Sequence, residues 1–321
     1  MAAGDLNDPE LHFLAAHGWG GATAASIPGD ASFRHYTRLI EGERKAILMS
    51  APPPQEDVGP FLLVARHLAA HDFAAPDILA ADEARGLVLL GDLGDRRMRE
   101  AVDAEPALER PVYEAAVDLL IRLHRAERVD RPLYDDAVLH REVDLFVDWW
   151  TPAAGLAIDR AGWSRAWTAV LSALPPPSVT VLRDYHAENI MLGEGPQPEL
   201  ALLDFQDALV GHPAYDLVSL LQDARRDVPG ELEAAMLARY RAATGADDAF
   251  LADYHRLGAQ RAAKVLGIFA RLSRRDGKHR YLNFMPRVWR HLRADLAHPA
   301  LASVASWFAA NVPDDLALAE P

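Results

Sequence analysis

Residues 181–192 read VLRDYHAENIML, and this stretch decides the fold more than any other part of the chain. Its polar centre holds Asp184 and Asn189, which are separated by four residues. Two short apolar segments flank this centre, Val179–Leu182 before it and Leu200–Leu203 after it, and we expect both to be strands. If these strands pair antiparallel, the polar side chains at one end of them lie close together.

The second apolar segment leads directly into a carboxylate, Asp204, fifteen residues after Asn189. Phosphoryl transfer needs these residue types, because one carboxylate accepts the proton of the attacking hydroxyl while an amide oxygen and a second carboxylate hold Mg²⁺. The same spacing would also arise if Asp184 and Asn189 only formed turns and Asp204 only capped the end of a strand. The order strand, loop, strand, aspartate therefore carries the prediction.

Composition excludes several classes of protein. The chain has 321 residues, of which 50% are hydrophobic and 25% charged, so it can bury a sizeable core and is not globally disordered. Lys and Arg number 33 against 47 Asp and Glu, a net charge of −14, which argues against nucleic acid as the main partner. The absence of cysteine excludes disulfides, thiolate catalysis and cysteine-bound metal.

The start of the chain, MAAGDLND, is acidic and lacks the basic and apolar regions of a signal peptide. No apolar run approaches the length needed to span a membrane. We therefore expect a soluble, cytoplasmic protein with no membrane partner, and the sequence does not predict its oligomeric state.

The first part of the chain is rich in predicted strands. A strand pair is expected over 33–40 and 46–49, joined by a turn at Glu41–Glu43. Apolar periodicity predicts helices over 5–19, packed through Leu11, Phe13, Leu14 and Trp19, and over 58–71, and further strands are expected over 75–79 and 86–90.

A change of character follows at Gly91–Asp95, where two glycines among acidic residues predict a hinge. Helical periodicity then dominates over 105–126, 142–150 and 214–310. We predict an α+β fold of two lobes, a small antiparallel-sheet lobe over 1–95 and a larger, mainly helical lobe over 96–321. Ligands commonly bind in clefts between such lobes.

The segment Asp184–Asn189, DYHAEN, resembles the catalytic loop of protein-kinase-like phosphotransferases, most closely the aminoglycoside phosphotransferase and choline kinase branch. Leu203–Phe205 is similar to the metal-binding segment of that superfamily, and Gly211–Val218 to the segment after it. The run from Leu182 to Asp227 resembles a narrower group, the bacterial kinases that phosphorylate the anomeric hydroxyl of N-acetylmuramate and N-acetylglucosamine during cell-wall recycling. Phe33–Tyr36 also fits that group.

The resemblance implies a role for each matching residue. Asp184 would be the catalytic base, and Asn189 and Asp204 the Mg²⁺ ligands. His186 would lie near the transferred phosphate, although a loop hydrogen bond explains a histidine there equally well. Asp216 would be structural, bonding the backbone of the catalytic loop.

The same resemblance implies a nucleotide-binding side with ATP as cofactor. Gly29–Ser32 would be the turn that covers the phosphates, with the Ser32 hydroxyl facing ATP. A hairpin turn without a ligand would have a similar sequence. Leu90–Leu93 would be the hinge whose backbone meets adenine, with Asp92 and Leu93 as the expected contacts.

Two departures from the superfamily's pattern concern the nucleotide-binding side, and a third is Leu182, where a histidine usually stands two residues before the catalytic aspartate. The ATP-positioning lysine is expected at the position that Met49 occupies, while Lys45, at the start of that strand, is better explained as a solvated turn residue. Its usual glutamate partner is missing from the helix over 58–71, and Glu56 just before it is a poor substitute. Phosphate neutralisation would then fall to Arg34, to Arg38 or to Mg²⁺ alone.

Residues 255–293 carry 11 Lys and Arg against one acid, Asp276. Four of these basic residues share one helix face at helical spacing: Arg261, Lys264, Arg271 and Arg275. We interpret this face as solvated and paired with acidic residues of the rest of the protein. The alternative is that it binds an anion such as the lactyl carboxylate of muramate. The central tryptophans are expected in the core, and Asp207, just past Asp204, is the better candidate for a sugar-hydroxyl contact.

The leading hypothesis is thus an ATP- and Mg²⁺-dependent kinase of an amino-sugar anomeric hydroxyl. A kinase for an aminoglycoside, choline or another metabolite alcohol is the alternative, because residues 183–227 carry nine acids against three arginines. A pseudokinase acting as a binding module is a third possibility, supported by the missing lysine–glutamate pair.

Overall fold

The predicted strand pair at the N-terminal side forms on either side of a turn. The computed structural model describes residues 6–27, 33–193 and 199–313. β2 (His35–Glu41) and β3 (Arg44–Ser50) pair antiparallel, from His35 opposite Ser50 to Glu41 opposite Arg44. Gly42 turns the chain between them with φ at +62°, a conformation that glycine adopts without a steric penalty. The predicted hairpin is confirmed.

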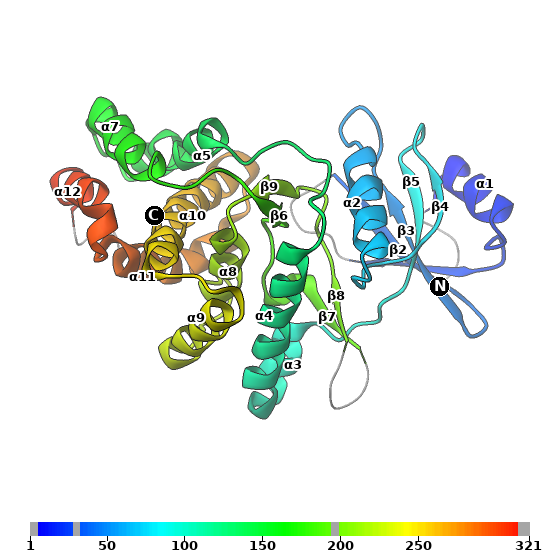
Figure 1. Ribbon diagram of the computed structural model, residues 1–321. Coiled ribbons are helices and arrows are strands. Elements are labelled where there is room, and N and C mark those ends of the chain that lie inside the picture. The colour runs from blue at the N-terminus through cyan, green and yellow to red at the C-terminus, as the bar shows by residue number, and fades with distance from the viewer. Residues whose placement is uncertain (1–5, 28–32, 194–198, 314–321) are drawn as a thin grey trace. The chain divides into compact units, whose positions relative to one another are not determined.

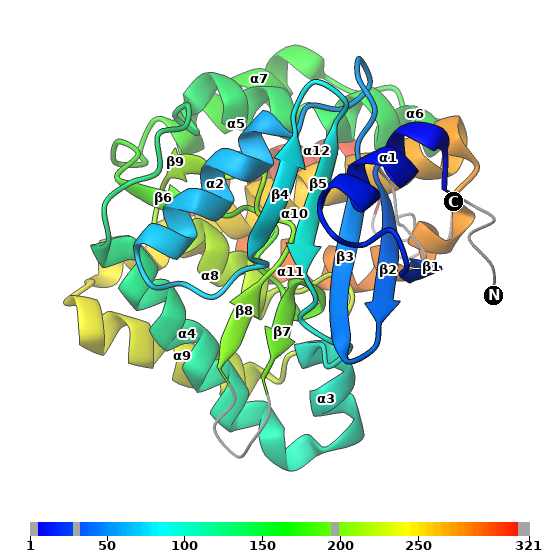
Figure 2. The same ribbon diagram turned by 90° about the vertical axis from the view of Figure 1, so that its right-hand side faces the viewer.

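A five-stranded sheet grows from this hairpin in the order β1-β2-β3-β5-β4, with every neighbouring pair antiparallel. The added strands are β1 (Thr23–Ile27), β4 (Ile78–Asp82) and β5 (Leu87–Gly91) (Figure 2). β5 matches its prediction, β4 begins later than predicted, and β1 was not predicted. The turn Gly29–Ser32, with Ser32, lies outside the described residues.

α1 (Asp8–Ala16) covers one side of this sheet, and α2 (Gly59–Ala70) lies on the opposite side (Figure 1). The α1 side is a buried cluster of Phe13, Leu14, Trp19, Leu39, Ala46, Leu48, Leu87 and Leu89. Leu11 was predicted to pack there, but its side chain is 40% exposed because it falls on the outer side of the helix.

The chain folds into two compact units. The first, here called the sheet unit, comprises the chain up to Glu100 together with Glu188–Asp207. The second, the helical unit, comprises Ala101–Ala187 and the chain from Ala208 onward. The sheet unit therefore includes a second, small ladder of β7 (Ile190–Leu192) and β8 (Leu200–Leu202).

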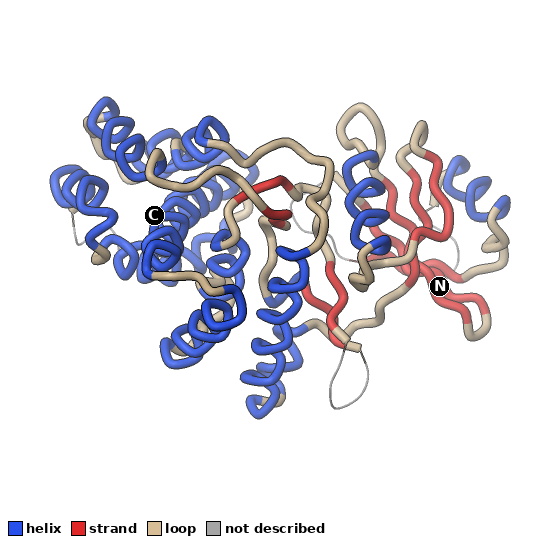
Figure 3. The backbone as a smooth tube through the Cα atoms, in the orientation of Figure 1, coloured by secondary structure: helices blue, strands red, loops and turns tan. Residues whose placement is uncertain are grey.

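The helical unit is built almost wholly from helices (Figure 3). Its α-helices are α4 (Glu109–Arg125), α5 (Asp136–Val143), α6 (Thr151–Ala153), α7 (Arg160–Leu171), α8 (Ala214–Leu221), α9 (Gly230–Thr244), α10 (Asp248–Asp276), α11 (Met285–Leu296) and α12 (Ala302–Asn311). α3 (Met98–Ala104) crosses from the sheet unit into it. Among the described residues, no helix is both long and apolar enough to cross a membrane.

α10 is the longest of these helices and packs against α8, α11 and the π-helical turn Phe146–Trp150. The Asp247 side chain caps its N-terminus by accepting from the N–H groups of Ala249 and Phe250. At Gly267 a Cβ atom would come within 2.3 Å of the Leu145 carbonyl carbon, so only glycine allows this close approach. Both faces of α10 are thus engaged by other elements.

The predicted pairing of the two apolar strands around the catalytic segment is wrong. β6 (Val179–Val181) pairs with β9 (Leu209–Gly211) in the helical unit, whereas β8 pairs with β7 in the sheet unit. Strands of three residues have no periodicity from which to choose a partner, and β7 and β9 were not predicted at all. The fold class, α+β with an antiparallel sheet and a helical part, is confirmed.

Candidate active site

The segment that carries Asp184 is held in place by a buried carboxylate. Asp216, in the first turn of α8, accepts from the backbone N–H of Leu182 at 2.6 Å and of Arg183 at 2.9 Å. Burial raises the pKa of Asp216 to about 7, although these two N–H donors oppose the shift. Arg183 adopts a positive φ of 72°, which turns the chain just before Asp184. Asp216 therefore fixes the backbone that presents Asp184.

Asp184 itself is half-buried among cationic groups of the helical unit. Burial alone would raise the pKa of this carboxyl, but Arg261 and Lys264 of α10 outweigh it and lower the pKa below the usual range. Asp184 is therefore ionised at neutral pH. A carboxylate in that state can accept a proton from a hydroxyl group.

The two α10 cations near Asp184 are themselves anchored. Lys264 Nζ lies 2.9 Å from a carboxylate oxygen of Glu142, which also pairs with Arg183. Arg261 donates to the Ser219 hydroxyl at 2.6 Å, and its guanidinium lies over the Tyr215 ring. Our interpretation of this face as solvated is wrong for both cations, because α8 and α5 pack against α10 there.

His186 is buried, and its Nε2 lies 3.2 Å from a guanidinium nitrogen of Arg225. Because an arginine can only donate, this ring nitrogen accepts, and the ring is neutral. Burial, together with Arg225, lowers the pKa of His186 to about 3. The structure therefore shows the loop hydrogen bond that was one of the two explanations for this histidine.

Asn189 and Asp204 come together within the sheet unit. Asn189 ends the turn Ala187–Asn189 just before β7, and Asp204 follows β8. The Asn189 amide nitrogen lies 3.4 Å from Asp204 Oδ2, and the backbone N–H of Leu203 donates to the Asn189 carbonyl at 2.9 Å. The β7–β8 ladder thus achieves the proximity that was expected from a different pairing.

The other oxygen of Asp204 accepts from the side-chain amide of Gln206 at 2.7 Å, and the Asp204 carboxylate is exposed. Phe205, the next residue, is buried and stacks on Phe61 of α2 with ring centroids 5.0 Å apart. Asp207 is exposed. The packing of Phe205 fixes the segment while its neighbouring carboxylates face outward.

The donor chemistry of Asn189 and Asp204 fits Mg²⁺, which takes carboxylate and amide oxygens. Within the part of the chain that the structure describes, no group of three or more His, Asp or Glu forms a closed metal cage. Mg²⁺ does not require one, because it usually keeps one or two protein ligands and completes its shell with water and substrate phosphates.

The expected adenine hinge follows β5, and its side chains are tied together. Arg38 of β2 pairs through Nε with Asp92 Oδ2 at 2.7 Å and through Nη1 with Asp95 Oδ1 at 2.7 Å. Arg38 also donates to the Gly94 carbonyl at 3.1 Å. The Asp92 carboxylate is therefore engaged in an ion pair, so a nucleotide contact at Asp92 or Leu93 would use the backbone.

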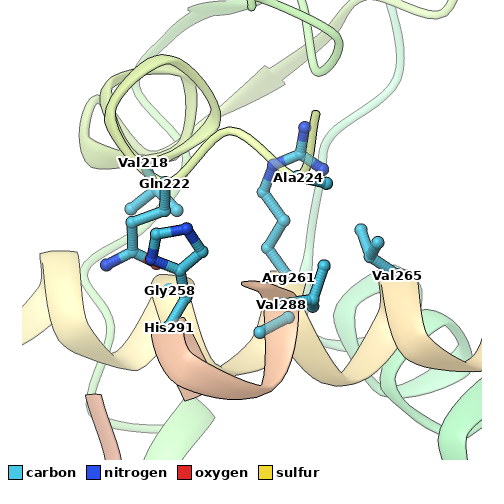
Figure 4. Close-up of a pocket in the computed structure, with 9 residues that line it drawn as sticks. Val218, Gln222, Ala224, Gly258, Arg261, Val265, Val288 and His291 are labelled. Carbon is cyan, nitrogen blue, oxygen red and sulfur yellow. The ribbon is translucent and has the colours of Figure 1, made fainter. Parts of the chain in front are cut away.

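A small cavity lies beside Arg261 in the helical unit (Figure 4). Its volume is about 20 Å³, and its polar lining comes from Gln222, Arg261 and His291. A space of that size holds about one water molecule and cannot admit a sugar ring. Of the central tryptophans, Trp150, Trp163 and Trp167 are buried in the core as expected, whereas Trp149 is half-buried.

Four residues around Asp184 and His186 were not predicted to act there: Glu142, Arg225, Arg261 and Lys264. Only the unusual excess of cations over 255–293 pointed toward two of them. Charged residues at helical spacing are most often solvated, so the sequence gives no sign that α10 is packed on that face.

Comparison with known proteins adds independent findings. A sequence model of the phosphotransferase enzyme family, APH, matches residues 23–259. The chain is 42% identical to an N-acetylmuramate/N-acetylglucosamine kinase of Caulobacter vibrioides, over 94% of this chain and 95% of that protein. It is 40% identical to the protein of the same name from Pseudomonas aeruginosa, over 92% and 91%.

Among solved structures, a choline/ethanolamine kinase family protein from Mesorhizobium loti matches with a TM-score of 0.65 and 16% identity, over 93% of this chain and 99% of that one. An ADP-bound aminoglycoside phosphotransferase, APH(2'')-Ib, matches with a TM-score of 0.63 and 14% identity, over 89% and 97%. At these identities the likeness establishes a shared kinase-like fold.

Proposed function

Because the chain belongs to the phosphotransferase enzyme family, we propose that it transfers the γ-phosphoryl group of ATP to the anomeric hydroxyl of an N-acetylated amino sugar. The acceptor would be N-acetylmuramate or N-acetylglucosamine, the sugars named for relatives with 42% and 40% identity. Such a reaction belongs to peptidoglycan recycling, and its cytoplasmic location stays a prediction.

The observation that carries this proposal is the ionised Asp184 on a loop fixed by Asp216. In the proposed reaction the anomeric oxygen bonds to the γ-phosphorus, and its proton passes to Asp184. The bond from the γ-phosphorus to the bridging oxygen breaks, and ADP leaves. Arg261 and Lys264 keep Asp184 ionised, so it is ready to accept the proton.

Asn189 and Asp204 would hold Mg²⁺, which neutralises phosphate charge when it is bound. We propose that Ser32, Arg34 and the backbone of Asp92 and Leu93 contact ATP. These roles rest on the resemblance and on the residues' positions, and Ser32 lies outside the described residues.

Two further residues have proposed roles. Asp207, exposed just past Asp204, would contact a sugar hydroxyl. His186 would position the catalytic loop beside the phosphate through its bond to Arg225, because a neutral, buried imidazole that accepts at Nε2 does not donate a proton from that atom. We also propose that residues 1–95 form the nucleotide-covering lobe and residues 96–321 the lobe that carries the catalytic loop and sugar site.

A substrate panel tests the proposal. The purified chain is mixed with Mg²⁺, ATP and one acceptor, either N-acetylmuramate, N-acetylglucosamine, kanamycin or choline, and ADP formation is followed. We expect turnover with the N-acetylated sugars only. Rapid turnover of kanamycin or choline with none of either sugar would contradict the proposal, as would Mg²⁺-dependent stabilisation by ATP with no turnover of any acceptor, the result for a pseudokinase.

A further inference from the structure

The sheet unit has an apolar residue where related kinases carry a phosphate-binding lysine. Met49 of β3 stands at that position, with no measurable exposure. α2, which would supply the lysine's glutamate partner, contains no acidic residue. If the chain binds ATP as proposed, any side-chain cation that meets the phosphates comes from a position other than that of the lysine.

The strand register identifies the neighbouring element. Tyr36 of β2 lies directly opposite Met49, and residues opposite one another in an antiparallel pair project from the same face of the sheet. Arg34 lies just before β2, and its guanidinium makes a hydrogen bond with the Tyr36 side chain. Arg34 thus presents a guanidinium to the tyrosine that stands opposite Met49.

Arg34 also has the acidic partner that such a cation needs. Its Nε lies 3.2 Å from Glu56 Oε2, and the backbone N–H of Phe33 donates to Glu56 Oε1 at 3.2 Å. The two charged side chains are only 11% and 15% exposed. Glu56 lies just before α2, so the pair joins the sheet to the start of this helix, as a strand lysine and a helix glutamate do in related kinases.

The Arg34–Glu56 pair lies near the proposed metal carboxylate. Burial raises the pKa of Tyr36, and Arg34, Asp204 and Glu56 all act on its hydroxyl, which Arg34 also contacts by a hydrogen bond. One tyrosine therefore has both the arginine and Asp204 as electrostatic neighbours inside the sheet unit. With Mg²⁺ held by Asp204, this part of the sheet unit would supply both a metal ion and a guanidinium to a phosphate group.

Arg38 projects from the same face of β2 as Tyr36, but its guanidinium is already engaged. Arg38 is held by Asp92 and Asp95 in the hinge. Lys45 is exposed at the opposite end of β3, four residues or about 13 Å along the strand from Met49. Arg34, by contrast, is paired with an acidic residue that lies just before α2.

We infer that Arg34, oriented by Glu56, takes the place of the missing lysine–glutamate pair and binds the phosphates of the nucleotide. This inference rests on the proposed kinase function and extends it by naming the phosphate-binding cation. Arginine suits the role, because its planar fork binds a phosphate through two hydrogen bonds where lysine offers a point charge. Glu56 acts through Arg34 and is a positioning residue.

A nucleotide series tests the inference by binding rather than by turnover. Calorimetry with adenosine, ADP and ATP in the presence of Mg²⁺ is carried out on the wild type, Arg34→Ala, Glu56→Gln and Lys45→Ala. Loss of a charged hydrogen bond predicts that Arg34→Ala weakens ATP binding by between about tenfold and a hundredfold. We expect unchanged adenosine affinity, a smaller loss of ATP affinity for Glu56→Gln, and wild-type binding for Lys45→Ala.

Several results would overturn the inference. One is an Arg34→Ala variant that binds ATP with wild-type affinity. Another is an Arg34→Ala variant that loses as much affinity for adenosine as for ATP. A third is a loss of ATP affinity in Lys45→Ala and none in Arg34→Ala. Thermal melts without nucleotide show whether each variant folds, and Arg34→Met, which keeps the apolar stem, replaces Arg34→Ala if the latter does not. If the wild type binds no ATP, the proposed function fails. If the wild type phosphorylates the sugar and Arg34→Ala binds ATP as the wild type does, only this inference fails.

Discussion

The surroundings of Asp184 and of Asp204 differ in a way that matches their proposed roles. Asp184 is half-buried, and its ionisation is set by Arg261 and Lys264, which are anchored by hydrogen bonds and an ion pair. Asp204 is exposed, and its two oxygens meet the neutral side-chain amides of Asn189 and Gln206. Two anchored cations thus stand beside the proposed proton acceptor, whereas the proposed metal ligand Asp204 faces two neutral amides.

The sharpest way to break this comparison is to remove the proton acceptor alone. Asp184→Asn keeps the shape of the side chain but cannot take a proton, so we expect turnover to fall by about 10²–10⁴-fold. ATP affinity should stay close to that of the wild type. Steady-state kinetics and calorimetry measure the two quantities, with Asp118→Asn, an exposed carboxylate paired with Arg239, as the matched control. Wild-type turnover in Asp184→Asn would refute the assignment.

Removing the other carboxylate should affect binding instead. Asp204→Ala takes away a proposed Mg²⁺ ligand, so the dependence of ATP affinity on Mg²⁺ concentration should largely disappear. Calorimetric titrations of ATP at several Mg²⁺ concentrations measure this dependence. If the ATP affinity of Asp204→Ala still depends on Mg²⁺ as in the wild type, Asp204 is not a Mg²⁺ ligand and the proposed difference from Asp184 is wrong.

A third change sharpens the account of Asp184. Lys264→Met removes a cation that lowers the pKa of Asp184, so this pKa should rise and the acidic limb of kcat/KM should move to higher pH. In the wild type that limb should lie below the ordinary range of an aspartate. Arg275→Met, an exposed position on the same helix paired with Asp276, is the control. An unmoved limb in Lys264→Met would contradict the electrostatic role.

The smallest expected effect concerns stability. The pKa of His186 is about 3 in the folded chain, below the value of about 6.5 for an unperturbed histidine. The unfolded chain therefore takes up the proton first, and stability that is present above pH 6.5 is lost as the pH falls toward 3. His186→Gln should remove at most about 3 kcal/mol of this loss between pH 6.5 and 4.

Urea unfolding at several pH values measures this difference between His186→Gln and the wild type. The exposed His12 supplies the control, because His12→Gln changes no buried imidazole. An unchanged slope of the unfolding free energy with pH in His186→Gln would show that His186 is not held neutral by the fold.

Much of the sheet unit could be predicted from sequence because its elements are long enough to show a period. β2 shows a rough alternation, β3 an apolar run after a turn, and α2 an amphipathic pattern. β1 was missed, since its sequence TAASI is small and weakly apolar. The three-residue strands failed for a different reason, because their pairing is decided by contacts between distant parts of the chain.

The residues of the candidate site also differ in whether a local sequence pattern reveals them. Asp184, Asn189 and Asp204 could be proposed from sequence because the motif that carries them is local and has the order strand, loop, strand, aspartate. Glu142, Arg225 and Lys264 were not, because their importance comes from burial against other helices. By sequence Glu56 is a poor substitute for the missing glutamate, because it precedes α2 and does not lie within it, and only the structure shows that it pairs with Arg34.

The central claim, phosphorylation at the anomeric position, is tested most directly by phosphorus NMR of the product formed from N-acetylmuramate and ATP. The account predicts one new phosphate ester whose phosphorus couples to the proton on the anomeric carbon, with loss of the reducing end of the sugar. An ester on the 6-hydroxyl with the reducing end intact would contradict it.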